Sequence, residues 1–149
     1  MWKLEAGERI SQWRDFRKTL DSLTFEQALE AVMDFWQGCP HHPFYLDATA
    51  PDKWPDPWQL IADNYYCDLA KALGMLYTIC LTKHVEGRDA EIRVYIDPET
   101  RYTYNLAIFD QGKYMLNFID GKILNISSIE TKLVLQHKYS ITDINIEQF

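Results

Sequence analysis

Apolar residues recur at steps of three and four through the middle of the chain, which is the spacing of one face of an α-helix. The pattern runs over residues 57–83, and the opposite positions are also largely apolar, so this helix should be covered on two sides. Asp56 can cap its N-terminus, and Pro57 suits the first helical position. The segment is therefore predicted to be a central helix. A break at Asn64 is the alternative, and it would give a short helix followed by a second one that begins near Cys67.

Two amphipathic helices are predicted before this segment, as a helical pair within residues 8–37. The second helix begins with a capping-box pattern, in which Thr24 is followed three residues later by Gln27, and Gly38 ends it. Residues 38–56 are rich in proline and are predicted to form a mostly extended connection.

The period of the apolar residues changes to two within residues 90–149, which is the signature of β-strands. Turn sequences separate the segments, and the strands are expected at residues 92–96, 102–108, 114–119, 123–126, 132–136 and 139–146. Because helices come first and a mainly antiparallel sheet second, the predicted class is α+β in a single domain over residues 1–149.

Composition and charge exclude several classes of protein. A chain of 149 residues with 47% hydrophobic residues can bury a sizeable core. The net charge of −7 and the lack of a basic cluster disfavour nucleic acid as a partner. We find neither an apolar run of about 20 residues nor a signal-peptide pattern, so no membrane partner and a cytoplasmic location are expected. The three cysteines have no CxxC spacing and fit reduced thiols.

A cysteine-bearing helix followed by antiparallel strands resembles the transglutaminase-like group of the papain-type fold. The resemblance covers roughly residues 54–126, and the motifs that carry it are Asp56-Pro57-Trp58, Cys67-Asp68, Leu69-Ala70 and Leu73-Gly74. It implies a central helix packed on a mainly antiparallel sheet. It also implies that Cys67 would be the nucleophile of a catalytic triad.

The residues expected to complete that triad are absent from the sequence. The resemblance places a histidine on the second strand, where this chain has Tyr104 and Asn105, and an aspartate on the third, where it has Asn117, with Asp120 in the following turn. A thiol needs a base or a positive neighbour to become a nucleophilic thiolate. The resemblance therefore implies a degenerate copy of the scaffold without the chemistry.

The sequence is also similar in style to small proteins of tailed bacteriophages. This similarity is carried by Trp54-Pro-x-Pro-Trp58, by Asn64-x-Tyr66-Cys67 and by the segment from Leu73 to Thr78. It implies a virion or assembly component, located in the virion if the gene is encoded by a phage.

Our first hypothesis for the function is a non-catalytic structural or protein-interaction protein. Its partner would be another protein or a copy of itself, and the residues expected at the contact are Trp54, Trp58, Tyr65 and Tyr104. A weaker alternative is that the same residues bind a small ligand or a glycan. It predicts a polar-rimmed apolar cleft beside Tyr65 and Tyr104.

The enzymatic alternative is a cysteine-dependent hydrolase or acyltransferase. In it Cys67 attacks an acyl group, and a displaced histidine, His84 or His41, acts as the base. The ordinary interpretations are that Cys67 is a buried apolar residue and that His84 interacts with a helix dipole. Neither a metal nor a cofactor is expected, because Cys39, His41, His42 and Asp47 lack the ligand spacing of a zinc site.

Overall fold

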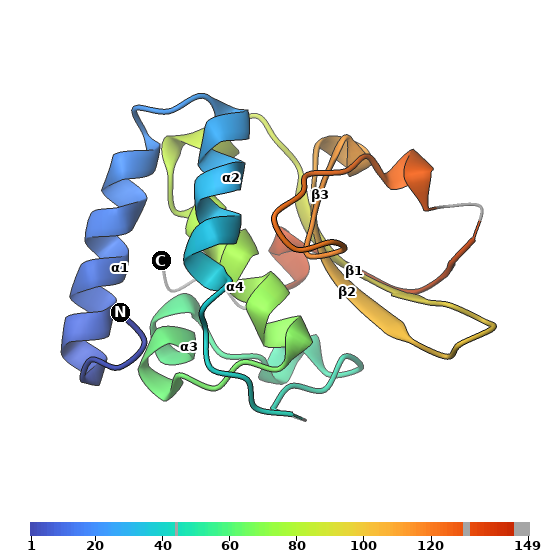
Figure 1. Ribbon diagram of the computed structural model, residues 1–149, viewed down its shortest axis with the longest axis horizontal. Helices are drawn as coiled ribbons and strands as arrows, with labels where there is room; N and C mark the ends of the chain where they lie inside the picture. The colour runs from blue at the N-terminus through green and yellow to red at the C-terminus, as the bar shows by residue number, and fades with distance from the viewer. Residues whose placement is uncertain (44, 130–131, 145–149) are drawn as a thin grey trace.

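The helices lie on one side of a four-stranded antiparallel sheet in the computed structural model, which describes residues 1–43, 45–129 and 132–144 (Figure 1). The helices are α1 (Ala6–Leu20), α2 (Phe25–Trp36), α3 (Pro57–Asp63) and α4 (Asp68–Cys80). The strands are β1 (Ala90–Ile96), β2 (Thr103–Phe109), β3 (Tyr114–Leu116) and β4 (Val134–Ser140), in the order β3-β2-β1-β4. The predicted α+β class is confirmed.

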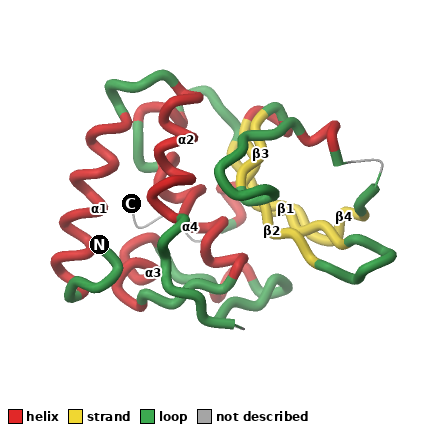
Figure 2. The backbone as a smooth tube through the Cα atoms, viewed as in Figure 1, coloured by secondary structure: helices red, strands yellow, loops and turns green. Residues whose placement is uncertain are grey.

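Helix α4 is the central element, and it lies between α2 and the strands β1 and β2 (Figure 2). Ten of its 13 residues are buried, so it is covered around most of its circumference. The expectation of a helix covered on two sides is confirmed for this segment. None of the helices in the described part of the chain has both the length and the apolar character needed to cross a bilayer.

The prediction of one continuous helix over residues 57–83 is wrong, and the alternative with a break at Asn64 is right. Asn64 is the C-cap of α3 and adopts a left-handed conformation with φ of 58°, which asparagine tolerates and which ends the helix. The Arg9 guanidinium then donates to the last α3 carbonyls, Ile61 O at 3.1 Å and Ala62 O at 2.8 Å. Cys67 begins α4 as its N-cap.

The predicted start signals of the other helices are confirmed. Thr24 and Gln27 form a complete capping box at α2, and the Asp56 side chain accepts a hydrogen bond from Gln59 N at α3. The connection over residues 38–56 contains one short 3-10 helix, η1 (Pro51–Lys53).

The segments predicted as strands at residues 114–119 and 123–126 form less of the sheet than expected. Strand β3 ends at Leu116 because Asn117 has φ of 76° and turns the chain out of the sheet. Residues 123–126 supply a single bridge, from Leu124 to Met115, before Asn125 caps the 3-10 helix η4 (Ile126–Ser128).

The two segments predicted at 132–136 and 139–146 are joined in one strand, β4. A register shift between Val94 and Tyr95 of β1 leaves Gln136 as an extra residue, and this bulge interrupts the alternation that the sequence shows. Residues 145–146 of the last predicted strand lie outside the described residues.

Candidate functional site

Cys67 lies at the N-terminus of α4, in the turn that separates this helix from α3. Its side chain caps the helix, since Sγ accepts a hydrogen bond from Ala70 N at 3.4 Å. The residue is only 8% exposed. A thiol in this position stands at the positive end of a helix, where the first N–H groups lack intrahelical partners.

The neighbouring carboxylate is held by two amides from the sheet. Asn105 of β2 donates from Nδ2 to Asp68 Oδ2 at 3.0 Å. Asn117, which follows β3, donates from Nδ2 to Asn105 O at 2.9 Å and to Asp68 Oδ1 at 3.2 Å. The side chains of Asp68, Asn105 and Asn117, with the Asn105 carbonyl, therefore form a closed network that joins the first turn of α4 to the sheet.

A cleft of about 330 Å³ opens beside this network. Its lining comes from the end of α2, the connection, the start of α4 and the turn before β2, and consists of Gln37, Cys39, His41, Tyr66, Cys67, Asp68, Lys71 and Tyr102. His41 reaches the cleft because it forms a parallel bridge with Tyr66, in which His42 N donates to Tyr66 O at 3.1 Å. The structure thus brings Cys67 and His41 to one cavity.

Burial sets the protonation of two groups that line the cleft. It raises the pKa of the Cys39 thiol to about 11, and the positive charge of Lys71 opposes this only in part. Burial also raises the pKa of the Tyr66 hydroxyl, and a negative charge on Cys39 would raise it further. Both groups are therefore protonated and neutral at pH 7.

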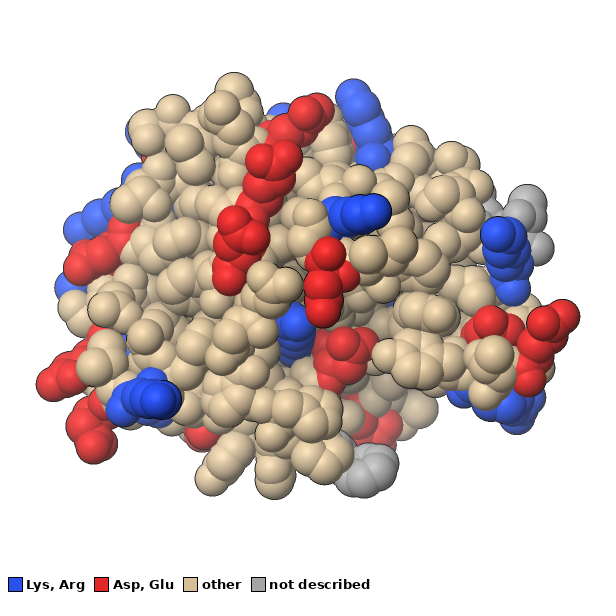
Figure 3. Space-filling model, viewed as in Figure 1, with Lys and Arg blue, Asp and Glu red and all other residues tan. Residues whose placement is uncertain are grey.

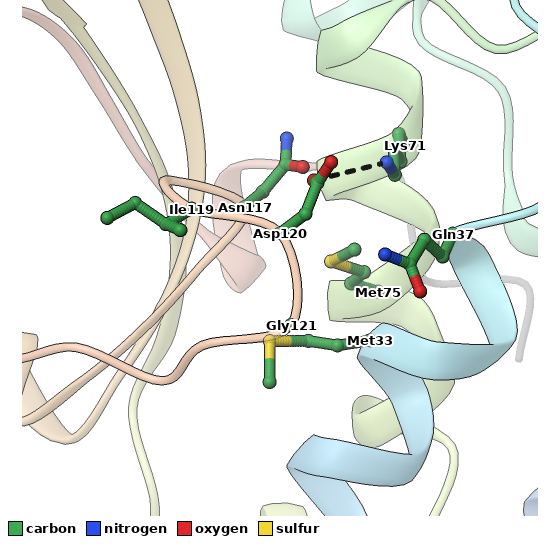
Figure 4. Close-up of a pocket in the computed structure, with 8 residues that line it drawn as sticks. All are labelled: Met33, Gln37, Lys71, Met75, Asn117, Ile119, Asp120 and Gly121. Atoms are coloured by element: carbon green, nitrogen blue, oxygen red, sulfur yellow. Dashed lines mark ion pairs between the residues drawn. The ribbon is translucent and has the colours of Figure 1, made fainter.

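A loop after β3 approaches the helices on the side of α2 (Figure 4). Lys71 of α4 and Asp120 of this loop form an ion pair at 3.8 Å, drawn as a dashed line across the gap. The gap, which Met33, Gln37 and Met75 also line, has a volume of about 10 Å³. It holds about one water molecule and adds little room to the cleft.

His84 is not brought to Cys67. His84 follows the C-terminus of α4, and the helix axis from Cys67 to Cys80 alone spans about 20 Å at 1.5 Å per residue. There Nε2 donates to the carbonyl of Leu20, the last residue of α1, at 2.7 Å. The predicted interaction with a helix C-terminus is thus present, although the helix is α1 rather than the one that precedes His84.

The four aromatic residues expected at a partner contact lie in different surroundings. Trp54 is 3% exposed, with its indole donating to Asp47 O, and it is not available to a partner at this exposure. Trp58 is half-buried against Trp13. Tyr65 is 51% exposed, while Tyr104 lies on the sheet, with its ring packed at an angle against Phe118. No three His, Cys, Asp or Glu side chains in the described ranges are grouped to hold a metal ion.

Comparison with known proteins gives matches in structure alone. No family model and no curated protein matches the sequence. The structure matches LapG of Legionella pneumophila with a TM-score of 0.69 at 16% identity, over 91% of this chain and 76% of that one. The calcium-bound form of LapG gives a TM-score of 0.70 at 16% identity, over 93% and 78% of the two chains.

The fold is transglutaminase-like. The EGTA-treated form of LapG agrees, with a TM-score of 0.66 at 16% identity over 91% of this chain and 77% of that one. In this fold Cys67 lies at the N-terminus of α4, Asn105 lies on the second strand, and Asn117 follows the third strand directly.

The chemistry available at the site follows from its side chains. The amides of Asn105 and Asn117 can donate hydrogen bonds but cannot take a proton from a thiol. Within the described residues, the Cys67 thiol hydrogen-bonds to Ala70 N and to no imidazole. Sequence reasoning placed Asn105 and Asn117 at the site but missed Asp68 as the group that they hold. Its position directly after the cysteine was the available signal.

Proposed function

We propose that this chain is a non-catalytic protein-interaction domain on a transglutaminase-like scaffold. The observation that carries the proposal is the amide pair of Asn105 and Asn117. They occupy the positions, on β2 and directly after β3, where the resemblance implies a catalytic base and acid. Both donate to Asp68 rather than orienting a base toward Cys67. The network gives these amides a structural role, since it fastens α4 to the sheet.

The cleft beside Cys67 is the surface that we assign to the partner. Its rim carries Tyr102, which is 57% exposed, and the turn before Cys67 carries Tyr65, which is 51% exposed. Exposed tyrosines are typical of the central residues of protein interfaces. The partner would be a copy of this chain or a neighbour in an assembly, such as the phage particle that the resemblance in sequence implies.

The decisive test is the reactivity of Cys67 toward iodoacetamide in the native protein at pH 7, followed residue by residue by mass spectrometry. We expect Cys67 to react no faster than the thiol of glutathione measured alongside it, because no base assists it. A rate two or more orders of magnitude above glutathione, abolished by Cys67→Ser, would overturn the proposal.

A matched double variant tests the reason for the missing chemistry. Asn105→His with Asn117→Asp supplies an imidazole and a carboxylate at the two strand positions. If Cys67 is unreactive because amides stand in place of a base and an acid, its rate of alkylation should rise at least tenfold over that in the unmodified chain. Thermal unfolding of the variant, compared with the unmodified chain, shows whether the fold has been kept.

A cysteine-dependent hydrolase or acyltransferase is the second candidate, and one observation favours it. His41 and Cys67 line the same cleft, so a shift of the connection can bring an imidazole to the thiol. This candidate predicts that the chain hydrolyses an activated ester such as p-nitrophenyl acetate and that both His41→Gln and Cys67→Ser abolish the turnover. His42→Gln is the matched control, since His42 instead packs against Tyr65.

A further inference from the structure

The face of the sheet turned away from the helices carries a second apolar cluster. Side chains alternate along β2, so Leu106 and Ile108 face away from the helices while Ala107 and Phe109 pack into the main core. The segment around η4 covers this second face. Its contribution is Ile126 and Ile129, which are 6% and 3% exposed.

The covering segment does not fill the space above the sheet, and a cavity of about 350 Å³ is left at the beginning of β2. One wall is aromatic, because the rings of Tyr104 and Phe118 lie 4.7 Å apart. Aliphatic side chains complete the interior, namely Ile119, Leu124, Ile129 and Leu133. The volume is at the lower end of the range for ligand pockets, which is about 300–1,000 Å³.

The rim of this cavity bears one charge of each sign. Asp97 lies in the turn after β1, where its Oδ1 accepts hydrogen bonds from Glu99 N at 2.9 Å and Thr100 N at 3.3 Å. These bonds use one carboxylate oxygen and leave Oδ2 for another group. Lys132, three residues after Ile129, also lines the cavity.

Within the described residues, neither of these two charged groups forms an ion pair, either with the other or with a third residue. The ion pairs among the described residues involve Lys71, Arg88, Arg93 and Lys138 as cations, and neither Asp97 nor Lys132 takes part in one. An apolar cavity of this size with a separate anion and cation at its mouth is complementary to a ligand with the same three features.

We propose that this cavity binds an α-amino acid with an aromatic or branched apolar side chain. The apolar side chain would enter between Tyr104, Phe118 and Leu124. The ammonium group would lie toward Asp97 Oδ2, and the carboxylate would lie toward Lys132. The cavity shares none of its lining residues with the cleft beside Cys67, so this inference is independent of the proposed interaction at that cleft.

Three ligands with one phenyl body test the inference, each titrated into the full chain and followed by amide NMR shifts. They are L-phenylalanine, which has both charges, 2-phenylethylamine, which has only the cation, and 3-phenylpropanoate, which has only the anion. We expect L-phenylalanine to bind about three- to fivefold more tightly than either analogue, as each partly exposed ion pair contributes a factor of this size. Equal binding of all three, stronger binding of a singly charged analogue, or no shifts at the cavity residues overturns the proposal.

A variant without the Asp97 charge tests whether this carboxylate holds the ammonium group of the ligand. Asp97→Asn keeps a side-chain oxygen for the two turn hydrogen bonds while it removes the anion, so the fold is expected to survive. This variant should bind L-phenylalanine no more tightly than 3-phenylpropanoate. The matched control is Asp52→Asn in η1, an exposed carboxylate that does not line the cavity, and it should leave all three affinities unchanged. If the two variants behave alike, the ammonium is not held at Asp97 and the proposal fails.

Discussion

The Thr78 hydroxyl lies where three helices meet, and it takes part in three hydrogen bonds. It accepts from the indole N–H of Trp13 in α1 and from that of Trp36 in α2, each at 3.0 Å. It donates to the carbonyl of Gly74, one turn earlier in α4, at 2.6 Å. Because all these groups are buried, one oxygen supplies the partner that two tryptophans need away from water.

Replacing Thr78 by valine should strongly destabilise the fold, although the two side chains have nearly the same size and shape. Thr78→Val keeps the volume but leaves two buried indole N–H groups without an acceptor, at a cost of about 1–3 kcal/mol for each. We expect the free energy of unfolding in urea to fall by about 2–5 kcal/mol. Thr78→Ser keeps the oxygen and loses a methyl group, so its loss should be about 1 kcal/mol. Equal losses for the two variants would contradict this account.

The helix caps could be predicted from the sequence, while the hydrogen bonds between residues far apart in the chain could not. Thr24, Gln27 and Asp56 cap helices through bonds that reach three residues, so their spacing alone predicted them. The bonds of Asp68 to Asn105 and Asn117 reach 37 and 49 residues. Only the resemblance in sequence pointed to those strand positions, and it did not reveal what the amides bind.

Among the elements, α4 shows how one position can set the distance between helices. Gly74 lies directly against the Trp36 ring, and a Cβ atom there would come within 2.4 Å of Trp36 Cη2. Helix α2 can approach α4 this closely because the glycine has no side chain. The apolar pattern in the sequence indicated that this face is buried, but it did not show that a tryptophan occupies the space.

The two glycines of the helices give a matched pair of substitutions. Gly74→Ala should lower the free energy of unfolding by about 1–3 kcal/mol, because the overpacking against Trp36 outweighs the better helix propensity of alanine. Gly7→Ala in α1 should raise it by about 0.5–1 kcal/mol, since a Cβ atom there meets nothing within 4 Å. Chemical denaturation of both variants measures the difference. A stabilising Gly74→Ala would show that α2 can move away at little cost.

The break between α3 and α4 marks the limit of periodicity as a guide. Apolar residues keep a helical spacing across Asn64, so the pattern alone favoured one helix over residues 57–83. The left-handed backbone of Asn64 ends α3. The hydrogen bond from Arg9, 52 residues earlier in the chain, to Ile61 O then holds this end of the helix. That break is what exposes a helix N-terminus at Cys67, so the element boundary and the candidate site have the same origin.

Considered as a whole, the molecule is acidic on its surface and rich in buried groups that titrate at high pH. Figure 3 shows acidic side chains in a row over α2, where Glu26, Glu30 and Asp34 follow one another at steps of four. Inside, burial raises the pKa of the Cys39 thiol to about 11 and that of Cys80 to about 12, from an ordinary value of 9.0. Burial raises the pKa of Tyr45, Tyr66 and Tyr77 as well.

The free energy of unfolding should therefore fall at alkaline pH. In the unfolded chain the thiols lose their protons near pH 9, while in the folded chain they keep them until about pH 11 or 12. Their contribution is complete below pH 9 and is lost as the pH rises through the folded pKa values. Urea unfolding at pH 8, 9.5 and 10.5 measures the slope. In the double variant Cys39→Ser and Cys80→Ala the slope should be shallower, and an unchanged slope would contradict the assignment to the thiols.

The order of the helices and strands could be predicted from the sequence. The bounds of the strands and the way in which the elements pack could be predicted only in part. Two helices, a connection, a cysteine-bearing helix and antiparallel strands follow from periodicity and turn residues. The bulge at Gln136 and the left-handed Asn117 changed the strand bounds, and the apolar alternation of the sequence shows neither of them. The cavity beside Tyr104 was expected in part, since a polar-rimmed apolar cleft was predicted there but beside Tyr65 as well.

The shared hydroxyl of Thr78 also has a consequence for synthesis of the chain on the ribosome. Trp13 and Trp36 leave the exit tunnel first, and their acceptor is 65 and 42 residues further along the chain. Until α4 has emerged, helices α1 and α2 cannot bury these indoles without stranding their N–H groups. We therefore expect the first half of the nascent chain to pack less stably before α4 emerges, because these N–H groups would lack their acceptor.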